Sequence, residues 1–170
     1  MKSAPQARPD GHGLRVAVLH AAFNATVVQG LLQGALEALR EAGVSESDIE
    51  TFEVPGAFEL PVVAGAAARA GRFDAIVALG AVIRGETDHY EHVARAAASG
   101  LGAVARETGL PVGFGVLTVR RAEQALRRSA AGPENKGAEA ARAAVATACL
   151  LRTLERRRRG RGRAARRPRS

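Results

Sequence analysis

The sequence predicts an α/β fold in three layers, in which helices flank both faces of a four-stranded parallel sheet. An unbroken apolar run from Ala75 to Leu79 continues through Gly80 to Ile83. Such runs, unlike alternating ones, are typical of strands buried on both faces of a parallel sheet. Strand-like and helix-like segments also alternate along the chain, as in βαβ folds. A length of 170 residues indicates one domain, and because aromatic residues make up only 4% of them, an aliphatic core is expected.

Four short segments are predicted to be the strands: residues 14–20, 49–54, 75–83 and 112–117. The first and third are rich in aliphatic residues, whereas the second, IETFEV, alternates apolar and polar residues. In the fourth, Gly113 and Gly115 indicate close backbone contacts and present Phe114 between them.

Helices are predicted between and after these strands. Asn24 or Thr26 can cap the first, whose apolar residues recur at helical spacing until Gly43 ends it. Pro61 is tolerated in a first turn, so the next helix opens at residues 57–61 and runs to Gly71. The remaining helices are expected at about residues 88–106, at 122–128 and at about 138–154.

A polar loop follows the third strand, where residues 84–89 read RGETDH. Ligands of open parallel sheets bind beyond the carboxyl ends of the strands, so this loop lies where chemistry is expected. Gly85 allows close backbone approach, Thr87 offers a hydroxyl and an amide to an anion at a helix start, and His89 offers an imidazole for proton transfer. The same pattern also occurs in proteins without a catalytic role, and the sequence pattern alone leaves both interpretations open.

Three other residues have competing interpretations. Phe23 lies at the mouth of the first strand, either as a platform for a ligand or as a hydrophobic staple onto the next helix. Glu59 either complements a helix dipole or accepts an N–H of a heterocycle. Cys149 lies in an Ala-rich segment and is interpreted as a small buried hydrophobe, not a nucleophile. The sequence shows no metal-ligand spacing and no disulfide framework.

The formal charge of +8 is concentrated in one segment. Residues 156–170 hold nine arginines and no acid, and without them the chain is nearly neutral. Such a run binds phosphate backbones, so nucleic acid is a candidate partner. It lacks the aromatic residues that stack on bases, and we expect a disordered, solvated tail.

Residues 1–13 are expected to form a flexible leader before the main domain, residues 14–155. The leader has no apolar segment of the signal-peptide type, and no stretch is long enough to span a bilayer. The sequence therefore predicts a cytoplasmic protein with no membrane association.

Five separated segments together resemble 6,7-dimethyl-8-ribityllumazine synthase, an enzyme family of riboflavin biosynthesis. They occur in the family's order and spacing, and the likeness runs from about Leu14 to Leu154. The segments are Phe23-Asn24, VPGAFELP at 54–61, GAVIRGETDHY at 80–90, PVGFGV at 111–116 and Asn135-Lys136-Gly137.

The resemblance implies a flavodoxin-like fold and the condensation of 5-amino-6-(D-ribitylamino)uracil with 3,4-dihydroxy-2-butanone 4-phosphate, which releases phosphate and water. It implies no metal and no cofactor. His89 would transfer protons, and Phe23 would stack on the pyrimidine. The other residues implied to bind the pyrimidine or the ribityl chain are Asn24, Ala57, Phe58, Glu59, Ala81, Val82, Ile83 and Phe114. Glu86, Thr87 and Arg128 would bind the phosphate, with Lys136, also a substrate-binding residue, nearby.

The resemblance further implies a pentamer, which in some members assembles into an icosahedral shell. Phe114 and Arg128 would then come from a neighbouring subunit, although Arg127 adjoins Arg128 and could take its role. Riboflavin synthase is a further candidate partner. Two alternatives remain: a non-catalytic, shell-forming relative, and a nucleic-acid-binding protein that uses the basic tail.

Overall fold

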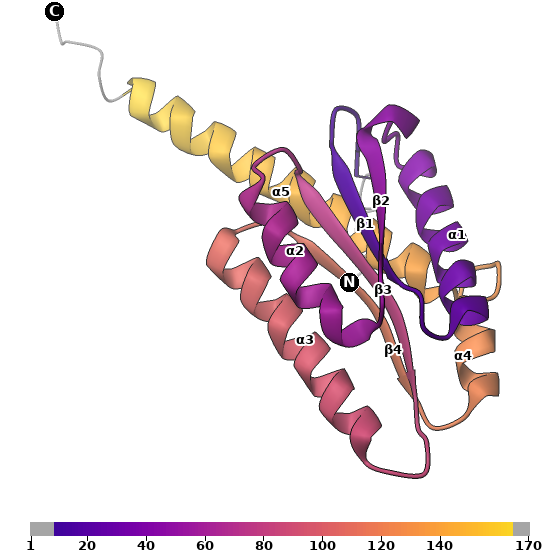
Figure 1. Ribbon diagram of the computed structural model, residues 1–170. Coiled ribbons are helices and arrows are strands. Elements are labelled where there is room, and N and C mark those ends of the chain that lie inside the picture. Colours follow the sequence, from indigo (N-terminus) through magenta and orange to yellow (C-terminus); the bar gives the residue numbers. More distant parts are fainter. Residues whose placement is uncertain (1–8, 165–170) are drawn as a thin grey trace, which may run out of the picture.

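The chain folds into a parallel sheet between two layers of helices, and the computed structural model describes residues 9–164 (Figure 1). The strands are β1 (Val16–Ala21), β2 (Ile49–Val54), β3 (Ala75–Ile83) and β4 (Val112–Val119). The α-helices are α1 (Ala25–Glu41), α2 (Leu60–Arg69), α3 (His89–Thr108), α4 (Ala122–Ser129) and α5 (Lys136–Ala164), and two short 3₁₀ helices cover Glu46–Asp48 and Ala57–Glu59.

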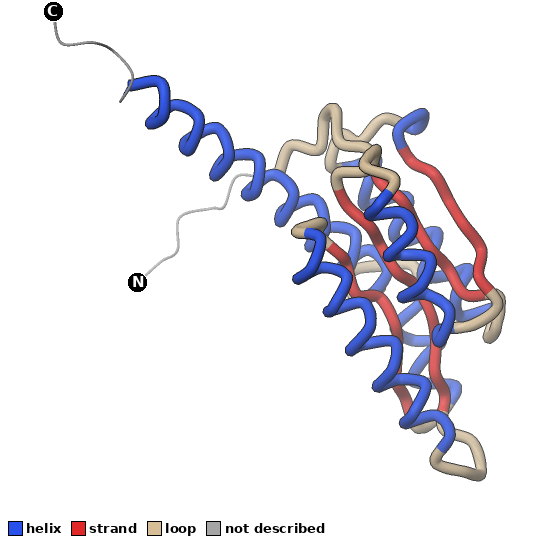
Figure 2. The backbone as a smooth tube through the Cα atoms, turned by 60° about the vertical axis from the view of Figure 1, so that its left-hand side comes forward, coloured by secondary structure: helices blue, strands red, loops and turns tan. Residues whose placement is uncertain are grey.

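The sheet has the strand order β2-β1-β3-β4, and all of its pairings are parallel. Helices α2 and α3 pack together on one face, whereas α1, α4 and α5 cover the other (Figures 1 and 2). This arrangement confirms the three-layer fold with a four-stranded parallel sheet, and it fits a flavodoxin-like fold. The central strands carry the core: every residue of β1 is buried, as is all of β3 except Ile83.

The predicted strands agree with the structure to within two residues. Strands β2 and β3 have the predicted bounds, whereas β1 begins at Val16 and β4 continues to Val119. The longer β4 follows from its pairing, because its register with β3 continues to Ile83 opposite Val119. The strand glycines do mark close contacts: a Cβ at Gly113 would overlap the Ala140 carbonyl.

The two ends of the described chain differ from expectation. The sequence predicts that the last helix ends near residue 154, but α5 continues to Ala164, so residues 156–164 of the expected disordered tail are helical. Residues 165–170 lie outside the described residues. Arginine has a high helix propensity, and the prediction of a disordered tail considered its charge alone.

Part of the expected flexible leader packs onto the domain. Gly11 is buried, and its amide donates to the carbonyl of Ala42 at 2.7 Å. The Cys149 thiol donates to the carbonyl of Asp10 at 3.1 Å, and Arg152 donates to that of Gly13 at 2.9 Å. Residues 9–13 therefore belong to the folded unit, while residues 1–8 lie outside the described part.

No described helix has the length and apolar character needed to cross a membrane.

Candidate functional site

A cavity of about 470 Å³ opens at the carboxyl ends of β1, β2 and β3. Its volume lies in the range of small-molecule sites. The following sequence-predicted residues line it: Phe23, Asn24, Ala57, Phe58, Glu59, Ala81, Val82, Ile83, Thr87 and His89. Three segments that are distant in sequence thus meet at the edge of the sheet where ligands of open parallel sheets bind.

The turn after β1 brings Phe23 to the mouth of this cavity. The amides of Ala22 and Phe23 donate to the carbonyls of Val54 and Pro55 at 2.8 and 3.2 Å, which ties the turn to the end of β2. The Phe23 ring is 71% exposed. A hydrophobic staple would bury the ring against α1, so its exposure favours the ligand platform.

Asn24 has a structural role that the sequence pattern did not reveal. Its backbone is left-handed, with φ of 58°, a conformation that asparagine tolerates better than most residues. Its side chain does not cap α1; instead Nδ2 donates to the Ala81 carbonyl at 2.7 Å. Asn24 therefore joins the turn after β1 to β3, and this bond fixes the spacing between Phe23 and the cavity floor.

The segment after β2 supplies the second wall. Ala57 is buried, while the Phe58 ring is 61% exposed at the rim. Glu59 precedes α2, and its carboxylate lies against Gly56, where a Cβ would come within 3.2 Å of Oε2. The position of Glu59 is therefore consistent with both a dipole partner and a hydrogen-bond acceptor inside the cavity.

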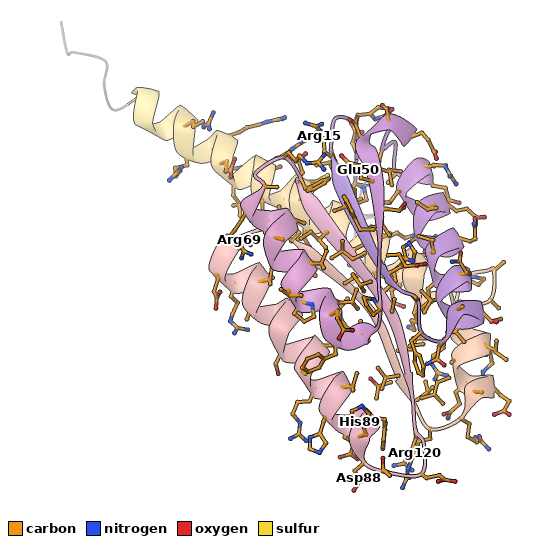
Figure 3. The ribbon with its side chains drawn as sticks, viewed as in Figure 1. Arg15, Glu50, Arg69, Asp88, His89 and Arg120 are labelled. Atoms are coloured by element: carbon orange, nitrogen blue, oxygen red, sulfur yellow. The ribbon has the colours of Figure 1, made fainter. Side chains whose placement is uncertain are left out.

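The third wall comes from the loop after β3 and the start of α3. His89 is the first residue of α3, and its amide donates to the Thr87 hydroxyl at 3.4 Å. Figure 3 shows His89 and Asp88 at this end of the molecule, near Arg120, which follows β4. The first amides of a helix lack partners within the helix, so Thr87 and the start of α3 form a place where an anion can bind. Glu86 is exposed in the same loop and does not line the cavity.

Phe114, Arg128 and Lys136 lie apart from these residues. They border a second cavity of about 430 Å³ along β4, between the ends of α4 and α5. Arg128 is half-buried and its Nη1 donates to the Gln124 carbonyl at 3.1 Å, whereas Arg127 is exposed and does not line this cavity. Lys136 pairs with Glu139. A single chain thus holds the sequence-predicted residues in two groups.

Several cavity residues were given no site role from the sequence, although all but Val93 lie in the quoted segments 54–61 and 80–90. Tyr90 and Val93 project from the first turns of α3, and Pro55 and Gly56 come from the turn after β2. The guanidinium carbon of Arg84 lies 6.0 Å from the centre of the Tyr90 ring, a cation–π contact that links the loop to α3. The helical spacing of His89 and Val93 could have identified Val93, because residues four apart share a face.

Among the described residues, no group of three or more His, Cys, Asp or Glu side chains could hold a metal ion. The cavity offers instead exposed aromatic rings, one carboxylate, one imidazole and a helix start. These groups suit a planar heterocycle together with an anionic group.

Comparisons with known proteins find a family model and relatives that match most of this chain. The family model described as 6,7-dimethyl-8-ribityllumazine synthase matches residues 13–152. A protein of that name from Kineococcus radiotolerans is 52% identical over 151 residues, covering 88% of this chain and 92% of the relative. Another from Anaeromyxobacter dehalogenans is 49% identical over 146 residues, covering 86% of this chain and 90% of the relative.

Proposed function

Because this chain belongs to the 6,7-dimethyl-8-ribityllumazine synthase family, we propose that it catalyses the reaction of that name in riboflavin biosynthesis. The enzyme condenses 5-amino-6-(D-ribitylamino)uracil with 3,4-dihydroxy-2-butanone 4-phosphate, releasing phosphate and water. The observation that carries the proposal is the cavity in which Phe23, Glu59 and His89 meet beyond the strands.

The reaction needs proton transfers that one imidazole can perform in turn. An amine attacks a ketone, so a proton must leave nitrogen and water must leave the resulting carbinolamine. His89 lines the cavity at the start of α3, within reach of a ligand held there. A general acid–base group of this kind contributes roughly a hundredfold to ten-thousandfold. Holding both substrates in register supplies further acceleration.

The heterocycle and the phosphate occupy different walls of the cavity in this proposal. Phe23 stacks on the pyrimidine, and Glu59 with the backbone near Ala57 and Ala81 accepts or donates hydrogen bonds to its polar edge. The phosphate lies at the start of α3, on the Thr87 hydroxyl and the amides of Glu86 and Thr87. The departing phosphate dianion then needs a nearby cation.

Arg128 of a second copy supplies that cation. Within one chain Arg128 and Phe114 lie in the β4 cavity, not with His89. The ring at each group is exposed: Phe23 by 71% and Phe114 by 48%. When Phe114 of one copy lies against the His89 cavity of a second copy, both Phe114 and the second copy's Phe23 become buried. Such a contact accounts for their exposure in the single chain, because large exposed apolar groups mark interaction sites. The β4 edge, with strand pairing on one side alone, is available to such a neighbour.

The assembly belongs to the same proposal. A head-to-tail contact between two different surfaces forms a ring when the rotation between neighbours closes, and the family resemblance favours a ring of five, with a shell of pentamers as a further step. The reaction is placed in the cytoplasm, and riboflavin synthase, which consumes the product, is a candidate partner. A nucleic-acid partner would depend on the arginine-rich residues 156–170 and would be independent of catalysis.

Mixing the purified protein with the two substrates and following the fluorescence of the lumazine tests the activity. Formation of the product at a rate well above that of the protein-free mixture is expected. A stable oligomer without product formation would identify the chain as a non-catalytic, shell-forming relative and would overturn the proposal.

A further inference from the structure

The last part of α5 leaves the body of the molecule as a single helix. Figures 1 and 2 show it extending beyond the sheet and beyond the other helices. We call residues 155–164, which read ERRRRGRGRA, the arginine arm. Their helical conformation gives the arginines a defined arrangement that a disordered tail would lack.

The last polar contact between α5 and the body lies just before this arm. Arg152 Nη2 donates to the Gly13 carbonyl at 2.9 Å and lies 3.2 Å from the Asp74 carboxylate. Residues 153–159 are all exposed. Both partners of Arg152 precede strands, so the arm leaves from the amino end of the sheet, opposite the His89 cavity. Binding at the arm therefore does not block the cavity of the same chain.

Residues 156–159 of the arm carry positive charge on all sides of the helix axis. Arg156, Arg157, Arg158 and Arg159 are consecutive and exposed, and within the described residues none of them forms an ion pair. Consecutive residues of an α-helix point about 100° apart, so the four guanidinium groups surround the axis. Like charges three or four residues apart repel one another, and this repulsion is relieved when anions bind on several sides.

We propose that the arginine arm binds nucleic acid through its phosphate backbone, without base-sequence preference. A duplex groove admits a helix and places phosphates on two sides of it, which matches charge distributed around the axis. The arm has no aromatic residue to stack on bases. Its polar side chains are those of Glu155 and the arginines, and arginine can contact the phosphates of any base sequence. It therefore contacts phosphates and does not select a sequence.

An anionic membrane fits the same charge less well. A helix that lies on a bilayer needs an apolar face opposite its charged face. The arm contains no apolar residue larger than alanine, and Leu150, Leu151 and Leu154 all precede it. A flat surface would also meet only one side of the helix and leave the other arginines unneutralised.

The test uses the full chain, a labelled 20-base-pair duplex and a salt series from 50 to 200 mM NaCl. The affinity of a protein that neutralises Z phosphates of duplex DNA falls with a log–log slope of about −0.9Z. Changing residues 156–159 from Arg to Gln is expected to make the slope shallower by about 3.6, so that roughly a hundredfold of the salt-dependent loss disappears. The Arg→Lys variant at the same four positions keeps the charge and should keep the slope.

Three results would overturn the proposal. The first is an unchanged salt slope in the Gln variant. The second is binding to vesicles that contain phosphatidylserine without binding to the duplex. The third is an affinity that differs tenfold or more between two duplexes of unrelated sequence. Far-UV circular dichroism and thermal unfolding of both variants verify that the fold is unchanged, since residues 156–159 contact no other element through an ion pair.

Discussion

The buried amide of Asn135 joins three helices near the start of α5. Its Nδ2 donates to the carbonyls of Gly30, Ser129 and Ala130 at 3.0, 2.9 and 3.1 Å, and its Oδ1 accepts from the Ala138 amide at 3.0 Å. The residue is 2% exposed. Its side chain fills the space above Gly34, where a Cβ would overlap it. Asparagine is suited to this position because it both donates and accepts.

Asn135→Ala is expected to lower the free energy of unfolding by about 3 kcal/mol, since it removes a helix cap and the side-chain hydrogen bond to the buried Ser129 carbonyl. Urea denaturation at fixed protein concentration measures the change. Asn135→Asp keeps the acceptor for Ala138 but places a carboxylate against three carbonyls. A variant with Asp that is as stable as the parent would show that the cap alone matters.

His89→Ala should lower kcat by roughly a hundredfold to ten-thousandfold and change KM much less, because the imidazole transfers protons while other groups hold the substrates. Steady-state lumazine formation gives both constants. His92 is the matched control: it is exposed on the same helix, three residues on, and does not line the cavity. Undiminished turnover in His89→Ala, or an equal loss in His92→Ala, would contradict the role of His89.

Arg128→Ala is expected to raise KM for the phosphate-bearing substrate at least tenfold, with little effect on KM for the pyrimidine, because only the former carries the anion. Arg127→Ala serves as control, since Arg127 is exposed outside the β4 cavity. Substrate kinetics of the two variants side by side distinguish them. The reverse pattern would transfer the role to Arg127.

At the scale of single residues, the sequence predicted which residues line the site better than it predicted the hydrogen bonds that their side chains form. The roles of Asn24 and Asn135 depend on partners 57 and 105 residues away, namely the carbonyls of Ala81 and Gly30. Local patterns describe only near neighbours. They therefore suggested a helix cap for Asn24 and could not reveal that its amide bonds to β3.

At the scale of elements, the strands were predictable because their ends carry strong signals. Pro55-Gly56 follows β2, and the charged residue Arg84 follows β3. Helix α5 was less well predicted at both ends. It begins at Lys136, earlier than about residue 138, because Asn135 caps it through the Ala138 amide, and it continues past residue 154 because arginines favour helix.

The contacts of Arg152 lead to a prediction about two parts of α5: the part up to Arg152, which is bonded to the domain, and the part from Arg156 onward. Arg152→Ala should lower the free energy of unfolding by about 1 kcal/mol, since it removes a half-buried ion pair with Asp74 and a hydrogen bond to Gly13. Deleting residues 156–170 should leave stability within about 0.5 kcal/mol, because surface changes away from such contacts have small effects. Chemical denaturation compares the two variants. A larger loss from the deletion would indicate that the arm packs on the domain.

At the scale of the whole molecule, one chain presents two separate groups of site residues. The group at the strand ends was predictable from the rule for parallel sheets, whereas Phe114, Arg128 and Lys136 were implied by the family resemblance alone. No local pattern marks a residue that acts in a neighbour's site. The shared site therefore remains a prediction of the assembly.

Mixed oligomers test this shared site. His89→Ala and Arg128→Ala chains are co-expressed so that they assemble together, and activity is measured at a concentration of the phosphate-bearing substrate far below the KM of the Arg128→Ala variant, where both parent variants are expected to have low activity. If the site is shared, random mixing restores about a quarter of the sites, because one contact in four combines an intact His89 with an intact Arg128. Specific activity measures the recovery. Oligomers of a chain that carries both substitutions serve as the control and should show no recovery. If the mixed oligomers also show no recovery, His89 and Arg128 act in the site of one and the same chain.

The contacts between residues 10–13 and residues 149–152 join segments 139 positions apart. During synthesis the first of these segments emerges early and must wait until α5 has left the ribosome. Closing so long a loop costs entropy before the contacts compensate for it. The amino end of the sheet, where Gly13 and Asp74 meet Arg152, is accordingly expected to order after the rest of the domain, as one late step in folding.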